Sequence, residues 1–173
     1  MNIRLAEREL KTKFGTYIEI LYYDGQSESI ALVMGNVEAR ENLLCRIHSS
    51  CISAHVFNSI ECECREEMEI SQKLIEKEGR GIVIWLDQEG KGNGHLALME
   101  SIKFKKQGST QGEAYKKAGY KADARSFRPA AEILAELKVK SVILLTNNPE
   151  KAEDLRRASI VVSDTKRITT AEA

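Results

Sequence analysis

Two short runs of almost purely apolar residues constrain the fold of this 173-residue chain more than any other feature. GIVIWL at 81–86 and SVILLT at 141–146 are each followed by a polar loop and then by a helical pattern. A strand that is apolar throughout, with no polar alternation, is buried on both faces and is typical of a parallel sheet covered by helices. We therefore expect both runs to lie inside a sheet.

The first part of the chain shows a different pattern. TYIEILYY (16–23) and SIALVMG (29–35) flank an Asp24-Gly25 turn and predict an antiparallel hairpin, and LLCRIH (43–48) predicts a third strand. Helical spacing is found at 66–79, about 95–106, 129–139 and 147–159, and SIVVS (159–163) predicts a last strand. Antiparallel strands followed by strand–helix units predict an α/β fold with a mixed sheet and flanking helices, in a single domain over residues 1–173.

Composition and charge argue against several classes of protein. Lys+Arg and Asp+Glu each total 26, so the formal net charge is zero, which argues against a broad nucleic-acid-binding surface. No apolar run approaches the roughly 20 residues that span a bilayer. The N-terminal stretch MNIRLAERELK is charged and lacks the apolar segment of a secretory signal. We expect a cytoplasmic protein without membrane or nucleic-acid partners.

Three of the four cysteines form a spaced set, C-x10-C-x-C, at Cys51, Cys62 and Cys64. In an extended backbone, Cys62 and Cys64 point to the same side and can hold one metal ion. Three thiolates leave the fourth tetrahedral position open for water, which is the layout of a catalytic zinc site. From the spacing alone, inert buried cysteines and redox chemistry remain alternatives. Cys45 belongs to an apolar strand pattern and is expected in the core.

Two loops occupy the same position in successive strand–loop–helix units. DQEGKGNG (87–94) and TNNPEK (146–151) each follow an apolar strand and precede a helix. Backbone N–H groups at a helix N-terminus bind anions, and ligands of such sheets gather at the carboxyl ends of the strands. Together the loops favour a phosphate-bearing ligand, although a plain glycine-rich loop is an alternative for the first.

Charged residues elsewhere could face the same ligand. Arg46 and His48 point away from Cys45 on their strand and lead toward Cys51, and a buried arginine needs a carboxylate or phosphate partner. An arginine on an exposed edge strand is the alternative. In KADARSFRP, Asp123 and Arg125 lie close together, and a solvated loop with a local ion pair is the simpler interpretation.

The motifs RIHSSC, VFNSIECEC, EGRGIVIWLDQEGKGNG, KADAR and LLTNNPEK, in this order and at these spacings, resemble GTP cyclohydrolase II, a zinc enzyme of riboflavin biosynthesis. The resemblance extends over nearly the whole chain. It implies a mixed α/β sheet, a homodimer, and a purine nucleotide as substrate. In that family an activated water attacks C8 of the guanine ring, and formate is then lost.

The resemblance also implies roles for individual residues. Cys51, Cys62 and Cys64 would hold Zn²⁺, and Asp123 and Arg125 would be catalytic, accepting a proton and acting at the α-phosphate to release pyrophosphate with Mg²⁺. Because arginine keeps its proton at neutral pH, Arg125 is better suited to stabilising phosphoryl charge than to attacking phosphorus. The positions that match the family's substrate contacts are Arg46, His48, Ser50, Glu67, Glu89, Gly90, Lys91, Gln111, Thr146 and Lys151.

Several positions depart from the family pattern, mostly around the ligand. The family usually has an acid at Ser50, glutamine at Glu67, arginine at Lys91 and threonine at Gln111. Near the cysteines, Ala54-His55 replaces Gly-Asp, and Arg65 replaces a glycine. No basic tail like that of the family follows the last predicted strand.

Ile102 stands where the family has a tyrosine associated with the steps at C8. An isoleucine neither donates nor accepts a hydrogen bond, so we hypothesise that the product keeps its formyl group. The pattern predicts a specialised relative that opens the imidazole ring of GTP or a related purine nucleotide. The alternative is a non-catalytic, zinc-stabilised homologue that binds nucleotides.

Overall fold

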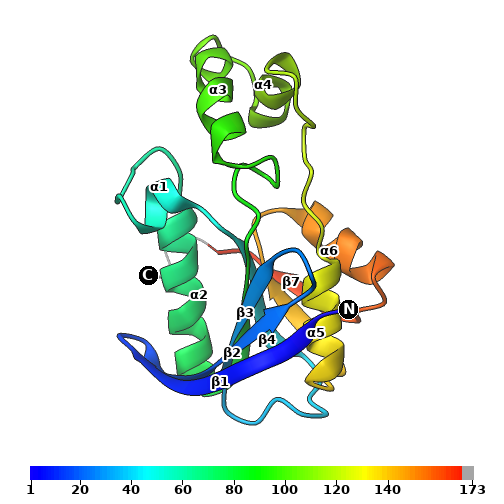
Figure 1. The fold of residues 1–173 in the computed structure, drawn as a ribbon. Helices are drawn as coiled ribbons and strands as arrows, with labels where there is room; N and C mark the ends of the chain where they lie inside the picture. The colour runs from blue at the N-terminus through cyan, green and yellow to red at the C-terminus, as the bar shows by residue number, and fades with distance from the viewer. Residues whose placement is uncertain (169–173) are drawn as a thin grey trace.

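A computed structural model of the protein describes residues 1–168 and contains a seven-stranded mixed sheet in the order β1-β2-β3-β5-β4-β6-β7 (Figure 1). The strands β1, β2, β3 and β5 pair antiparallel, whereas β4 pairs parallel with both β5 and β6, and β6 pairs parallel with β7. The predicted mixed α/β fold is confirmed. The strands are β1 (Ile3–Thr12), β2 (Gly15–Tyr23), β3 (Glu28–Met34), β4 (Leu43–Ser49), β5 (Gly81–Leu86), β6 (Val142–Leu145) and β7 (Val162–Lys166).

Helices cover both faces of the sheet. The helix α2 (Cys64–Glu78) packs on one face, and α5 (Arg128–Glu136) and α6 (Pro149–Arg157) pack on the other. Ile82 and Ile84 of β5 belong to the core beneath α5 and α6, while Val83 belongs to the core beneath α2. This two-sided burial explains why the strand is apolar throughout, as predicted.

Several local predictions are confirmed. The hairpin turn is closed by the Asp24 carboxylate, which accepts hydrogen bonds from the backbone N–H groups of Gln26 and Ser27 at 2.8 and 2.9 Å. The helix α2 ends at Gly79, whose φ of +74° is a left-handed conformation that favours glycine. Cys45 is fully buried in the core.

Two strands differ from the prediction. The strand β1 was not expected, because it is an edge strand with mostly exposed and often charged residues, and it carries no apolar alternation. The last strand begins at Val162, not at Ser159 as predicted. The N–H groups of Ser159 and Ile160 bond back to carbonyls of α6, so these residues close the helix instead of starting a strand.

Two helices project beyond the sheet as a separate layer (Figure 1). They are α3 (His95–Lys106), which was predicted, and α4 (Gln111–Lys117), which was not. The sequence signal for α4 is a capping box, in which Thr110 and Glu113 bond reciprocally to each other's backbone N–H groups. We call residues 93–121 the helical arm.

Two connecting segments, residues 87–92 and 122–127, join the helical arm to the rest of the chain. The backbone N–H of Ala124 donates to the Lys91 carbonyl at 2.9 Å. The Gln88 amide both accepts from and donates to the backbone of Ser126, at 2.7 and 2.8 Å. Side-chain and backbone bonds thus hold the segments against each other, which fixes the direction of the arm.

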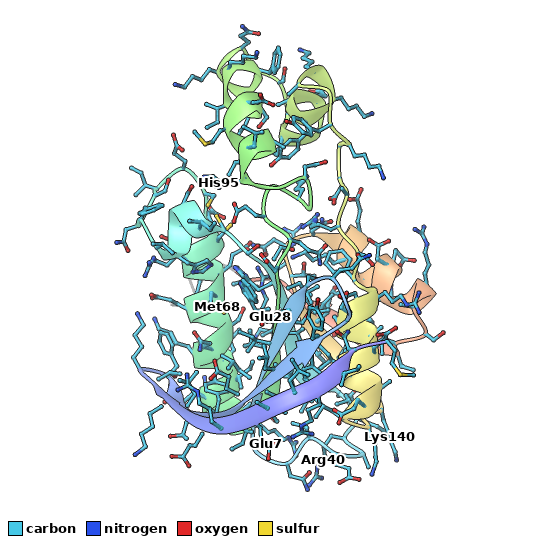
Figure 2. All side chains as sticks on the ribbon, viewed as in Figure 1. Glu7, Glu28, Arg40, Met68, His95 and Lys140 are labelled. Carbon is cyan, nitrogen blue, oxygen red and sulfur yellow. The ribbon has the colours of Figure 1, made fainter. Side chains whose placement is uncertain are left out.

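The two ends of the sheet differ in character. The parallel strands β4, β5 and β6 end at the same edge, and the helical arm rises from that edge. Figure 2 shows His95 at the base of the arm, and Arg40 and Lys140 at the opposite edge of the molecule. Within residues 1–168, no helix has the length and apolar character to cross a membrane.

The two connecting segments can lie close together because position 92 is a glycine. Its φ is +79°, and an added Cβ would lie 2.8 Å from the carbonyl carbon of Ala124. We expect Gly92→Ala to lower the free energy of unfolding by roughly 2–4 kcal/mol, from left-handed strain together with overpacking. Urea denaturation measures this loss.

Gly79 provides a matched control. Its φ is +74°, close to that of Gly92, but no atom of residues 1–168 lies within 4 Å of an added Cβ. Gly79→Ala should therefore cost only the conformational strain, about 1–2 kcal/mol. Equal losses in the two variants would contradict the proposed contact between the connecting segments.

Candidate active-site cleft

Loops at the carboxyl ends of the parallel strands and one face of the helical arm enclose a cleft of about 380 Å³. Most of the positions selected from the sequence line it, whereas Asp123 and Thr146 lie outside the lining. A larger groove of about 550 Å³ lies between α5 and α6, but its charged side chains largely pair with one another. The predicted residues that line the cleft are Arg46, His48, Ser50, Cys51, Cys62, Cys64, Glu67, Glu89, Gly90, Lys91, Ile102, Gln111, Arg125 and Lys151.

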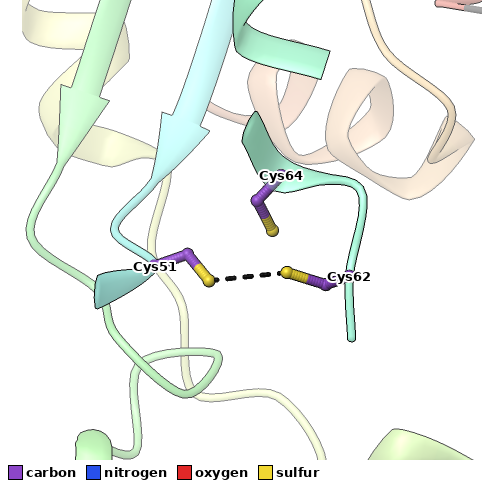
Figure 3. Close-up of side chains that lie close together, drawn as sticks. All are labelled: Cys51, Cys62 and Cys64. Carbon is purple, nitrogen blue, oxygen red and sulfur yellow. Dashed lines mark hydrogen bonds between the residues drawn. The ribbon is translucent and has the colours of Figure 1, made fainter. Parts of the chain in front are cut away.

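Three cysteines converge at one end of this cleft (Figure 3). Cys51 follows β4 and precedes the short helix α1 (Ile52–His55), Cys62 lies in the next loop, and Cys64 is the first residue of α2. Their Sγ atoms all lie within 4.8 Å of one another, and those of Cys51 and Cys62 are 3.6 Å apart. The spacing C-x10-C-x-C therefore brings three sulfur atoms together at the start of a helix.

The geometry of the three sulfur atoms fits a tetrahedral metal ion. Zn–S bonds of about 2.3 Å at tetrahedral angles place sulfur atoms about 3.8 Å apart, close to the spacing of Cys51 and Cys62. Burial raises the pKa of the Cys51 and Cys64 thiols, and the neighbouring cysteines contribute to this rise. A bound cation would favour the thiolates. The cysteine cluster can thus bind a metal.

Arg46 lies beneath the cleft on β4 and is only 2 % exposed. Its guanidinium donates to the carboxylate of Glu67 at 2.5 Å and to the carbonyl of Leu145 at 3.0 Å, while Nε has no partner among residues 1–168. Glu67 also accepts a bond from the Asn147 amide at 3.1 Å. The charge that Glu67 adds relative to a glutamine is therefore paired with a buried arginine.

A histidine pair continues this network toward the cysteines. The Nδ1 atom of His48 is 3.3 Å from the Arg46 guanidinium, and its Nε2 is 2.9 Å from Nε2 of His55. Burial, together with the positive charge of Arg46, lowers the pKa of His48 to about 2, so it is neutral.

Arg65 donates to the carbonyls of Ala54 and His55 and holds α1 in place. Two departures from the family pattern, His55 and Arg65, thus act together.

Positive charge also gathers on the side of the cleft near β6 and α6. Lys151 is buried and donates to the Ile47 carbonyl at 3.3 Å. Burial, with the nearby charges of Arg46 and Arg125, lowers the pKa of Lys151 to about 7. An anion bound here would stabilise the charged form of this lysine.

Asp123 and Arg125 form an ion pair with several contacts. The guanidinium of Arg125 donates to both carboxylate oxygens of Asp123, and its backbone N–H bonds to one of them at 3.1 Å. Burial raises the pKa of Asp123, but these hydrogen bonds outweigh it and the net pKa is lower than usual. The Arg125 side chain is 11 % exposed and lines the cleft.

The loop after β5 carries Glu89, which is buried. One of its carboxylate oxygens accepts the N–H of Ile52 at 2.9 Å, next to Cys51, and the other lies 3.6 Å from Nδ1 of His95. Ser50 donates to the carboxylate of Asp87 at 3.2 Å, so an acid is present here although position 50 is not acidic. Glu89 thus connects the cysteine loop with the helical arm.

Five residues of α3 line the cleft and form its wall opposite the cysteines: His95, Leu98, Met99, Ile102 and Lys105. They follow the i, i+3, i+4, i+7, i+10 spacing of one helical face. Our sequence interpretation singled out Ile102 but not His95, although this spacing places both on the same face. Tyr115 of α4 also lines the cleft, and burial raises its pKa to about 12.

Comparison with known proteins decides the family. The sequence matches the family model of GTP cyclohydrolase II over residues 3–168. The chain belongs to the GTP cyclohydrolase II family. It is 40% identical over 156 residues to the GTP cyclohydrolase-2 of Archaeoglobus fulgidus, which covers 89% of this chain and 41% of that protein. It is 38% identical over 161 residues to the GTP cyclohydrolase-2 of Actinobacillus succinogenes, covering 92% of this chain and 74% of that protein.

Other relatives of the family are larger proteins. The riboflavin biosynthesis protein RibBA of Bacillus cytotoxicus is 39% identical over 153 residues, covering 87% of this chain and 38% of that protein. The chain thus spans about two fifths of the length of two of these relatives. Among solved structures, RibBX, a two-domain 3,4-dihydroxy-2-butanone 4-phosphate synthase from A. baumannii, shares the fold with a TM-score of 0.53 at 14% identity. It covers 98% of this chain and 40% of that protein.

The buried pair of Arg46 and Glu67 predicts a large difference between two substitutions. Glu67→Leu leaves the arginine charge buried without a carboxylate and should lower the free energy of unfolding by about 3–5 kcal/mol. Glu67→Gln keeps an acceptor for the guanidinium and should cost only about 1 kcal/mol. Urea denaturation of both variants measures the difference.

The neighbouring acid serves as a control, because Glu66 makes no ion pair within residues 1–168. Glu66→Leu should lose less than about 1 kcal/mol, from the helix N-terminus alone. A loss in Glu67→Leu no greater than that in Glu66→Leu would contradict the assigned role of the pair.

Proposed function

We propose that the protein is a zinc-dependent cyclohydrolase that opens the imidazole ring of GTP, or of a related purine nucleotide, at C8 and releases pyrophosphate in the presence of Mg²⁺. We further propose that it works as a homodimer. The observation that carries the proposal is the cleft itself, with three convergent thiols at one end and the buried cations Arg46, Arg125 and Lys151 along it. Family membership supports the same activity.

Cys51, Cys62 and Cys64 are the residues that would hold zinc. Three protein ligands leave a fourth position, at which zinc supplies a Lewis acid and lowers the pKa of bound water toward about 7. The α3 face lies across the cleft from the cysteines, so a planar base inserted between them would have its reacting carbon near that position. The apolar side chains Leu98 and Met99 would exclude water from the faces of the base.

Lys151 and Arg125 would bind the phosphates. Both are largely buried, so their charges are weakly screened and act strongly on an anion in the cleft. Asp123 orients Arg125 through its carboxylate and would accept a proton during phosphate chemistry. Arg46 is already paired with Glu67, so its charge toward a ligand is reduced relative to a chain with glutamine at this position.

Turnover and metal content test this proposal together. Zinc-loaded protein with GTP and Mg²⁺ should change the purine absorbance and release pyrophosphate, with about one zinc per chain. Cys62→Ser should lose both the metal and at least 100-fold in turnover, because two thiols hold zinc far less tightly than three. Arg125→Ala should reduce pyrophosphate release by a similar factor.

Cys45 offers a matched control, because it is buried in the core away from the cleft. Cys45→Ala should keep the zinc and the turnover. Binding of nucleotides without any turnover by the zinc-loaded protein would favour the non-catalytic homologue and contradict the proposed enzyme.

The nature of the product depends on Ile102. Removing a formyl group expels an amine from an amide, which needs a proton donor placed on the intermediate. Ile102 lines the cleft and has no group that donates or accepts. We therefore propose that the main product keeps its formyl group. Tyr115 is the competing donor, because its side chain lines the same cleft and stays protonated.

Mass spectrometry of the product, with a parallel formate assay, tests this proposal. Formate should appear at least 100-fold more slowly than the ring opens, in keeping with the roughly 10²–10⁴ that one proton donor contributes. Ile102→Tyr should raise formate release. Formate produced in step with GTP consumption would contradict the truncated reaction, and its loss in Tyr115→Phe would then identify Tyr115 as the donor.

A further inference from the structure

His95 and Glu89 form a carboxylate–histidine pair at the junction of the helical arm and the cysteine loop. Nδ1 of His95 is buried, has no hydrogen bond within residues 1–168, and lies 3.6 Å from the Glu89 carboxylate. The other oxygen of that carboxylate accepts the N–H of Ile52, which directly follows Cys51. Glu89 therefore lies between the His95 imidazole and the backbone next to the first of the three thiols.

The second ring nitrogen of His95 is available to a ligand. The side chain is 38 % exposed and lines the cleft, and Nε2 is neither buried nor hydrogen-bonded within the described part of the chain. The other two of the chain's three histidines, His48 and His55, direct their Nε2 atoms at each other. Figure 2 shows His95 at the base of α3, facing α1.

His95 also has suitable chemistry for its place in the cleft. The arm residues that line the cleft include three titratable side chains, His95, Lys105 and Tyr115. An imidazole both gives and takes protons near neutral pH, whereas an amine or a phenol with a pKa of about 12 gives up a proton far less readily. A carboxylate facing Nδ1 favours one tautomer and one orientation of the ring, as in other carboxylate–histidine pairs.

We infer that His95 is a catalytic residue that donates the proton to the ring nitrogen leaving C8, and that Glu89 is its positioning residue. This inference rests on the proposed ring-opening activity. The family motif EGRGIVIWLDQEGKGNG ends at Gly94, one residue before His95. The proton-donor role of His95 is therefore inferred from the geometry of the cleft.

The proton balance of the step is complete without any oxidant or reductant. Water adds to C8, and its oxygen becomes the formyl oxygen. Nε2 of His95 takes the proton of the hydroxyl group at C8 as the carbonyl forms. A C8–N bond breaks, its electron pair remains on the nitrogen, and that nitrogen takes this proton from Nε2. The two protons of the water end on the two ring nitrogens, and the protein is unchanged.

The proposed role of His95 differs from the role that a proton donor at position 102 would have. The two side chains lie on the same face of α3, two turns apart, so they meet different parts of a bound ligand. A proton donor at His95 serves the first C–N cleavage, while the lack of one at Ile102 leaves the second without help. The two positions together would account for a ring opening whose product keeps the formyl group.

A simpler role for His95 would be to close the loop 89–95 through Glu89. His95→Gln separates the two roles, because the amide can still bond to Glu89 but cannot transfer a proton. We expect kcat for ring opening to fall roughly 10²–10⁴-fold with KM changed less than threefold and the melting temperature kept. His95→Ala should fall similarly and should regain at least tenfold with added imidazole.

Leu96→Gln is the matched control on α3. Leu96 is 66% exposed and does not line the cleft, so this variant should keep the wild-type turnover. His95→Gln with kcat within threefold of wild type would overturn the inference in favour of the loop-closing role. Failure of imidazole to restore any activity to a folded, zinc-loaded His95→Ala protein would overturn it as well.

A second measurement does not depend on turnover. Because the chain has three histidines, their ring signals can be assigned in nitrogen-15 NMR spectra from single substitutions. In the wild type the His95 signal should show Nδ1–H, and Glu89→Gln should change the tautomer of that ring alone. A ring that is unaffected by Glu89→Gln would overturn the pairing. An inert wild type with the pairing intact would instead show that the proposed function fails, and the catalytic role with it.

Discussion

The parallel pairing of β4 with both β5 and β6 is the constraint on which the rest of the structure depends. Each of these strands is buried by helices on its two faces, and their carboxyl ends meet at one edge. The loops that follow must therefore lie side by side, and they carry Cys51, Glu89 and Thr146. Hydrophobic burial far from the cleft thus brings together groups whose own interactions are too weak to do so.

Beneath that edge, polar side chains replace the usual apolar core. Arg46 is held by Glu67, a backbone carbonyl and His48, and His48 contacts His55 at the cysteine loop. Each member limits the positions of the next, so the network fixes the depth and charge of the cleft floor. The ion pair and hydrogen bonds of the guanidinium offset part of the cost of burying this arginine, and removing any of them would leave a buried charge less well satisfied.

The sequence predicted the interior of the fold better than its periphery. GIVIWL could form little other than a strand buried on both faces. Gly79 could readily adopt the left-handed conformation that ends a helix. The strand β1 has no such signature, since its side chains are mostly exposed and it pairs with β2 through backbone hydrogen bonds across a tight turn. In the cleft, C-x10-C-x-C pointed to three converging thiols, although Cys64 begins a helix and the extended backbone expected between Cys62 and Cys64 is not formed. The contacts of Arg46, Glu67 and His95 depend on which elements meet in space, and spacing along the chain does not encode that.

The helical arm is joined to the sheet by two segments, and only a few hydrogen bonds hold these segments to each other. It contributes an entire wall of the cleft, yet it adds almost nothing to either core of the sheet. Substitutions of the exposed side chains on that wall should therefore cost little of the free energy of folding. A lineage can exchange a tyrosine for an isoleucine, or place a histidine two turns away, while the thiols and the phosphate-side cations stay where they are. The product of the reaction can therefore change through substitutions in the helical arm, while the sheet that holds the thiols and cations stays the same.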